Sequence, residues 1–102
     1  MGKVAIFLVF SMVLTACGSR DVSIHYATQE QIMAQFPPGP GMERNGYAQW
    51  DWRSCDIYIV TPEEFAERYP VGFVDIWGES IATWDDLYAH ELRHCDEGNF
   101  HP

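Results

Sequence analysis

The chain has 102 residues and a formal net charge of −9, because 15 acidic residues outnumber six basic ones. The arginines are scattered and form no basic stripe, which makes nucleic acid and anionic lipid headgroups poor partners. Hydrophobic residues make up 47% of the chain and include four tryptophans, which indicates one small folded domain rather than a disordered tether. Because so small a core is near the limit for unaided folding, we expect a metal, a disulfide or a partner to stabilise it. We expect the protein to be a monomer.

The first 16 residues have the pattern of a secretory signal. Lys3 is followed by an apolar stretch at 4–14 that is short for a membrane span. The sequence LTAC, which ends at Cys17, resembles the lipobox of bacterial lipoproteins. That resemblance implies cleavage before Cys17 and a lipid on its sulfur, so that residues 1–16 are a lipoprotein signal peptide. The alternatives are an ordinary signal peptide cleaved nearby and a membrane span.

The same resemblance implies where the protein lies. Residues 17–23 would form a lipidated tether and residues 24–102 the folded domain, held to a membrane of the bacterial cell envelope through the N-terminal lipid. Gly18 follows the cysteine, in place of the aspartate that usually retains lipoproteins in the inner membrane. In a host with two membranes the outer membrane is therefore favoured, with the domain on its periplasmic or surface face.

The remaining chain predicts a mixture of strands and helices. We expect, in chain order, a strand at 24–27, a helix at 29–36, a strand at 55–60, a helix at 62–69, a strand at 71–77, a short strand at 80–82 and a helix at 84–97. Threonine N-caps precede the three helices, at Thr28, Thr61 and Thr83. Residues 42–51 are expected to be an exposed connection containing an Asn-Gly turn. This order predicts an α+β domain with a short mixed or antiparallel sheet and a C-terminal helix.

The cysteines suggest a covalent cross-link. With Cys17 lipidated, Cys55 and Cys95 remain as an even pair, which in an oxidising compartment predicts a disulfide. Such a bond would lock the last helix to strand 55–60. Two buried free thiols, or a metal-binding role for Cys95, are the alternatives.

The closing stretch HELRHCDEGNFHP contains the residues with metal chemistry. Residues four apart lie on one face of a helix, so His90 and His94 can direct imidazole nitrogens toward the same ion. Glu91 is displaced by one position, so it need not bind the metal and can act as a general base.

A catalytic zinc ion usually has three protein ligands, so a third is needed. Glu97 lies on the same helical face, but it is almost two turns from His90 and would not easily share an ion with it. His101 is better placed, because Gly98 can end the helix and let the chain return toward the metal.

The set His90, Glu91, His94, Gly98 and His101 resembles the HExxH zinc metallopeptidases, or zincins, and among them the metzincins, in which a third histidine follows a glycine turn. The chain has one residue more than the metzincin pattern between the second histidine and the glycine. The resemblance implies a small zincin-like domain that holds Zn²⁺ with three histidines and uses Glu91 as the base. It implies a metalloendopeptidase of the cell envelope that hydrolyses a peptide or protein substrate.

Two other functions remain open. A non-catalytic envelope lipoprotein would use zinc only to stabilise its fold and would bind a protein partner. An interaction module cross-linked by the disulfide alone would contain no metal. Glu91 distinguishes the peptidase from the non-catalytic lipoprotein, because only a peptidase needs it as a base.

Other positions have less specific expectations. No motif identifies a residue that stabilises the transition state, and Tyr58, Tyr88 and Arg93 are the candidates. Either strand 55–60 or strand 71–77 would offer the sheet edge along which an extended substrate pairs. The remaining histidine, His25, is isolated in the sequence and is expected to be structural.

Overall fold

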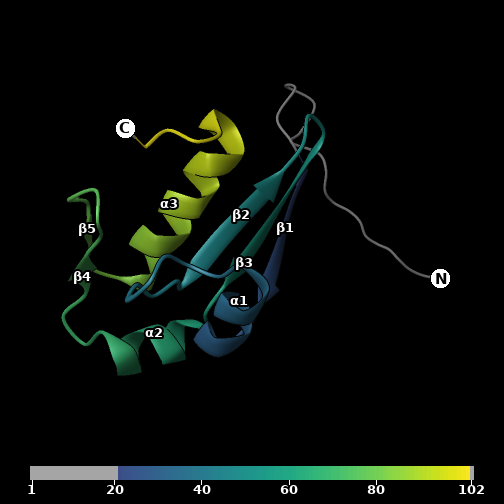
Figure 1. Ribbon diagram of the computed structural model, residues 1–102. Coiled ribbons are helices and arrows are strands. Elements are labelled where there is room, and N and C mark those ends of the chain that lie inside the picture. Colours follow the sequence, from purple (N-terminus) through teal and green to yellow (C-terminus); the bar gives the residue numbers. More distant parts are fainter. Residues whose placement is uncertain (1–20, 102) are drawn as a thin grey trace.

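The structure is a computed structural model that describes residues 21–101, so the expected signal peptide and the Cys17 anchor lie outside the described residues. Within this part, three helices accompany a three-stranded and a two-stranded sheet, which confirms an α+β fold (Figure 1). The larger sheet has the order β1-β3-β2. In it β3 (Ser54–Ile59) runs parallel to β1 (Asp21–Tyr26) and antiparallel to β2 (Gly46–Trp50), so the sheet is mixed.

The central strand β3 forms the middle of the core. It matches the strand predicted at 55–60, and its side chains alternate between buried and half-buried positions. Cys55, Ile57 and Ile59 face inward and are fully buried. Because β3 pairs on both sides, the expectation that it offers an edge to a substrate is wrong.

The two outer strands differ from the sequence prediction. β1 begins at Asp21, inside the expected tether at 17–23, because the pairing with β3 extends back to Ser54. The expected exposed connection at 42–51 contains β2 instead. Asn45, just before β2, is buried, and its side chain accepts a hydrogen bond from Gln29 at 2.9 Å, so no exposed Asn-Gly turn forms.

The three helices begin where their caps predict. α1 (Gln29–Gln35), α2 (Pro62–Arg68) and α3 (Trp84–Glu97) each follow a threonine whose hydroxyl accepts a backbone N–H of the first turn. The caps of α1 and α3 are full capping boxes, in which a side chain at the third helical position bonds back to the cap. Local sequence therefore determines where the helices start.

A short hairpin replaces the longer strand expected at 71–77. β4 (Phe73–Val74) pairs with β5 (Ser80–Ile81) for two residues each. Asp75 ends β4, because its carboxylate accepts the backbone N–H groups of Trp77 and Glu79 at 2.9 and 2.8 Å and closes a turn.

The helix α3 packs against β2 and β3, and the C-terminal segment runs back beside it (Figure 1). The predicted disulfide is present: Cys55 on β3 and Cys95 on α3 have Cα atoms 5.6 Å apart. Leu87 and Cys95 are buried on the core face of α3, and Tyr88 and Leu92 are partly buried beside them. Glu91 is buried between Leu87 and Cys95 on the same face, and His90 and His94 lie beside it along the helix. No helix within residues 21–101 is long and apolar enough to cross a membrane.

Candidate metal centre

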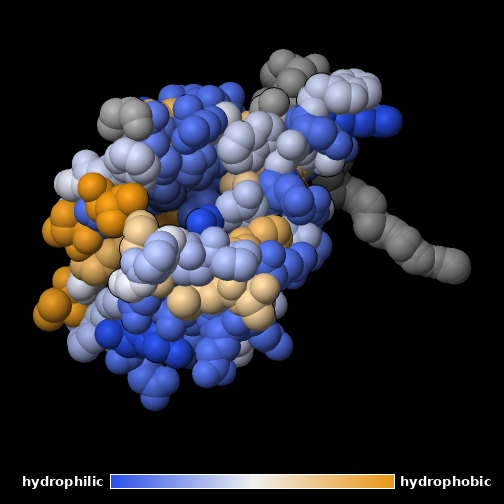
Figure 2. Space-filling model, in the orientation of Figure 1, coloured by the Kyte–Doolittle hydropathy of each residue, from blue (hydrophilic) through white to orange (hydrophobic). Residues whose placement is uncertain are grey.

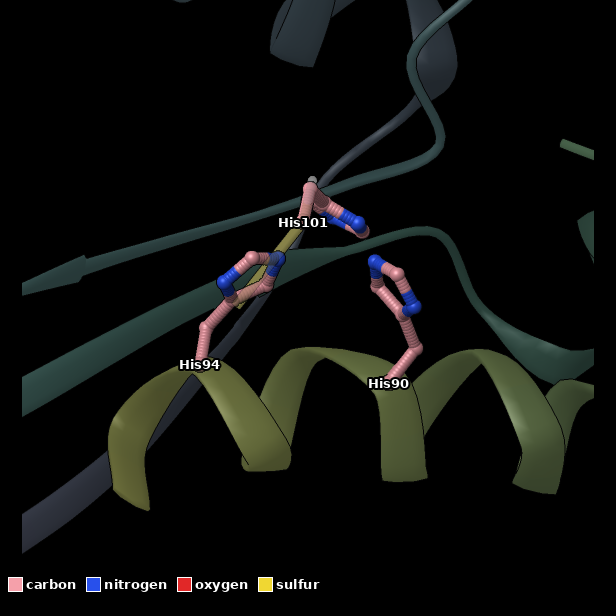
Figure 3. A group of neighbouring side chains, drawn as sticks. All are labelled: His90, His94 and His101. Atoms are coloured by element: carbon pink, nitrogen blue, oxygen red, sulfur yellow. The ribbon is translucent and has the colours of Figure 1, made fainter. Parts of the chain in front are cut away.

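The end of α3 brings three histidines together. The N–H of Gly98 donates to the carbonyl of His94 at 2.8 Å, and Gly98 then takes a φ of 69°, which only glycine adopts freely. The chain reverses there and places His101 opposite His90 and His94 (Figure 3). One ring nitrogen from each histidine lies within 4.8 Å of the others. The three predicted ligands thus converge.

Each histidine on α3 has a partner for its second ring nitrogen. Nδ1 of His90 lies 2.9 Å from Oε1 of Glu79, and Nδ1 of His94 lies 2.8 Å from the carbonyl oxygen of Gly98. In the tautomer with the proton on Nδ1, both imidazoles donate these bonds and keep a lone pair on Nε2. Ligating histidines in metal sites are oriented by contacts of this kind.

Aromatic rings pack against the three histidines. The indole of Trp50, from β2, stacks on His94 with a centroid distance of 5.8 Å and an interplanar angle of 8°. The indole of Trp77, from the turn between β4 and β5, stacks on His101 at 4.9 Å and 11°. The imidazoles are therefore held between two tryptophans that come from separate parts of the chain.

Burial favours neutral imidazoles at this site. It lowers the pKa of His94, an effect that the hydrogen bond to the Gly98 carbonyl partly offsets. It also lowers the pKa of His101. Neutral imidazole is the form that binds a metal ion, so fewer protons compete at neutral pH.

The carboxyl of Glu91 is buried next to the histidines. Only 6% of the residue is exposed, and burial is the main cause that raises the pKa of Glu91 to about 8. A side chain at Gly46 would place its Cβ 3.0 Å from Oε2 of Glu91. The first residue of β2 must therefore be small for Glu91 to occupy this position.

A cavity of about 730 Å³ opens over these groups. Its wall includes His90, Glu91, His94 and His101, together with residues of β2 and of the β4–β5 hairpin. Figure 2 shows the surface hollowed near its centre, with apolar residues gathered on the left of the view. The exposed apolar residues of the hairpin segment are Val71, Val74, Ile76 and Trp77. The candidate ligands and base thus share one solvent-accessible space.

Comparisons with protein-family models, curated proteins and solved structures found no match. The resemblance to zincins therefore rests on the residues and geometry described above.

Several other predicted residues lie away from the cavity. Tyr58, Tyr88 and Arg93 do not line it, so they are poor candidates for stabilising a transition state there. Glu97, weighed as an alternative ligand, instead accepts a bond from Arg93 at 3.2 Å. His25 lies 2.9 Å from Asp56 and stacks on Tyr58, and it does not line the cavity.

A second trio, Asp75, Glu79 and His90, also has ligand atoms within 4.8 Å of one another. Asp75 already closes the hairpin turn, and Glu79 holds Nδ1 of His90. These bonds explain why the three groups lie together: they close the hairpin turn and orient His90. Sequence reasoning missed Glu79, and nothing in its position eleven residues before His90 would have identified it.

Proposed function

We propose that the protein is a zinc-dependent metalloendopeptidase. One observation carries the proposal: ring nitrogens of His90, His94 and His101 lie within 4.8 Å of one another, beside the buried Glu91 in the same cavity. Three imidazoles fit zinc by softness and by number, because a catalytic zinc site uses three protein ligands and keeps one position open. Bound there, zinc would supply Lewis-acid polarisation of a peptide carbonyl and activation of water.

Glu91 would act as the general acid and base of hydrolysis. Its carboxylate accepts a proton from the attacking water and then donates that proton to the leaving amine. The exclusion of bulk water around a carboxyl that is 6% exposed strengthens its interactions with charged groups in the cavity. Gly46 leaves room for this carboxyl, because a Cβ at that position would lie 3.0 Å from Oε2.

The proposal extends to location. The lipobox-like sequence that ends at Cys17 supports a lipid anchor in the bacterial cell envelope, with the outer membrane favoured. The open cavity supports a peptide or protein substrate. The charge of −9 argues against nucleic acid as a partner.

The test uses the full-length chain purified in detergent, as wild type, His101→Ala and Glu91→Gln. Zinc per chain is measured by mass spectrometry, and hydrolysis is measured on a peptide library. We expect about one zinc in wild type, less in His101→Ala, and undiminished zinc in Glu91→Gln with kcat lowered by roughly 10²-fold or more.

The same measurement separates the alternatives. Zinc binding without hydrolysis in either wild type or Glu91→Gln would favour a non-catalytic lipoprotein that binds a partner. No zinc, and a melting temperature that EDTA leaves unchanged, would favour a module cross-linked by its disulfide alone.

A further inference from the structure

Arg44 is the only lysine or arginine among residues 21–101 that lines the cavity. The same wall carries the acidic groups Glu43, Asp75 and Glu91. A single permanent cation in an otherwise acidic cavity is a specific feature, because its charge does not change over the working pH range.

The guanidinium of Arg44 has bonding capacity that the protein does not use. Its Nε is buried and has no hydrogen-bond partner among the described residues. The group lies over the ring of Tyr47, 4.8 Å from its centroid. By contrast, Arg68 and Arg93 are paired with glutamates on their own helices at 3.0 and 3.2 Å. A buried donor without an acceptor costs free energy, which an incoming anion would recover.

Arg44 also lies close to the candidate base. It precedes Gly46 by two residues, and a Cβ at Gly46 would lie 3.0 Å from Oε2 of Glu91. Both side chains line the cavity, and the positive charge of Arg44 acts to lower the pKa of the Glu91 carboxyl. An anion held by Arg44 would therefore lie in the same cavity as the reacting groups.

We propose that Arg44 binds a carboxylate of the peptide substrate and so determines specificity next to the scissile bond. The inference rests on the proposed function and names the substrate class: peptides with an anionic group near the cleaved bond. The planar guanidinium matches a carboxylate, to which it can donate two parallel hydrogen bonds. Two sources supply this group, namely an Asp or Glu side chain and the C-terminus of a short peptide.

The test measures binding to the zinc-loaded, full-length Glu91→Gln chain by fluorescence anisotropy. The probes are fluorescein-labelled octapeptides in three matched forms: neutral with a C-terminal amide, the same with one Gln→Glu exchange scanned along the peptide, and neutral with a free C-terminal carboxylate. We expect one charged form to bind about tenfold more tightly or better, since charge-assisted hydrogen bonds have that strength. The charged form that binds more tightly identifies the source of the carboxylate.

Variants in the same background assign the effect to Arg44. Arg44→Gln should abolish the preference, and Arg44→Lys should keep part of it, because lysine retains the charge without the planar fork. Arg53→Gln is the matched control: Arg53 is also stacked on an aromatic ring, that of Trp52 at 5.4 Å, but it is exposed and outside the cavity. Zinc also attracts carboxylates, so the series is repeated in EDTA, where a preference due to Arg44 should persist.

The outcomes are distinct. Equal affinity for all three peptide forms, no binding of any form, or a preference that survives Arg44→Gln would overturn the inference. If Arg44→Gln has no cooperative melting transition, two other measurements test the inference: the binding preference of Arg44→Lys, and the salt dependence of the preference in the chain that retains Arg44. A contact through Arg44 must weaken in both cases. A chain that binds zinc and cleaves neutral and charged peptides equally keeps the proposed function and loses this inference. A chain without zinc or hydrolysis loses the proposed function, while the EDTA series still tests Arg44.

Discussion

Single side chains outside the HExxH pattern hold the candidate ligands in place. Glu79 belongs to the hairpin segment just before β5, yet its carboxylate lies 2.9 Å from Nδ1 of His90. The His90 side chain is only 10% exposed, so this contact is partly shielded from water. The bond fixes which nitrogen faces the other two histidines, and it makes the imidazole a stronger ligand.

We therefore expect Glu79→Gln to weaken zinc binding by about tenfold or more, because the neutral amide orients His90 less strongly. The dissociation constant for zinc is measured by competition with a chromophoric chelator. The matched control is Glu67→Gln, which removes an exposed charge from α2. Equal zinc affinity in Glu79→Gln and wild type would show that Glu79 has no positioning role.

Elements with a local signal in the sequence were predictable, whereas β2, which depends on pairing, was not. Each helix starts after a threonine cap that can be identified within four residues of sequence. β2 lacks such a signal: it forms because the segment pairs with β3, and its opening glycine is required by contact with Glu91. The convergence of the three histidines was predictable for the local reason that a helix and a glycine turn arrange them.

At the same scale, the disulfide connects α3 to the sheet next to a ligand. Cys95 follows His94 directly, and its bond to Cys55 closes a loop with a sequence separation of 40. Chain entropy predicts a loss of about 4 kcal/mol in the free energy of unfolding when this loop is opened.

We expect the double variant Cys55→Ala, Cys95→Ala to unfold at lower urea concentration and to bind zinc more weakly. Both effects have one cause, since α3 loses its attachment to β3 and the histidines lose their fixed spacing. Urea titration and chelator competition measure them, with dithiothreitol-treated wild type as a comparison. A variant that loses stability and keeps full zinc affinity would show that the helix needs no covalent attachment to hold the metal.

At the scale of the whole molecule, the candidate site lies where three parts of the chain meet. α3 supplies two histidines and Glu91, β2 supplies the wall with Trp50, and the β4–β5 hairpin supplies Trp77 and Glu79. The acidic carboxyl of Glu91 is buried at this junction, so its protonation is linked to global unfolding. Removing the metal exposes this linkage, because a divalent cation close to Glu91 would lower its pKa by attraction.

The metal-free protein should therefore lose stability as the pH rises. Burial raises the pKa of Glu91 from 4.5 to about 8, so the folded state binds the proton more tightly than the unfolded state. The resulting stabilisation is complete below the unfolded pKa and is lost as the pH rises through the folded pKa. The lowered pKa values of His94 and His101 have the opposite effect and make the protein more stable as the pH rises. This effect occurs below about pH 7, where histidines titrate. Above that pH the change in stability therefore reports on Glu91.

Between about pH 7 and about pH 8.5 we expect the free energy of unfolding in EDTA to fall by roughly 1 kcal/mol, or by about 5 °C in melting temperature. Glu91→Gln should show no such fall, because its amide does not ionise, and it should melt above wild type at the upper pH. The free energy of unfolding of zinc-loaded wild type should fall less than that of the protein in EDTA, because the ion favours the ionised carboxylate of Glu91. Melting curves of the three samples across this range test the linkage, and a fall in Glu91→Gln equal to that of wild type would assign it to another group.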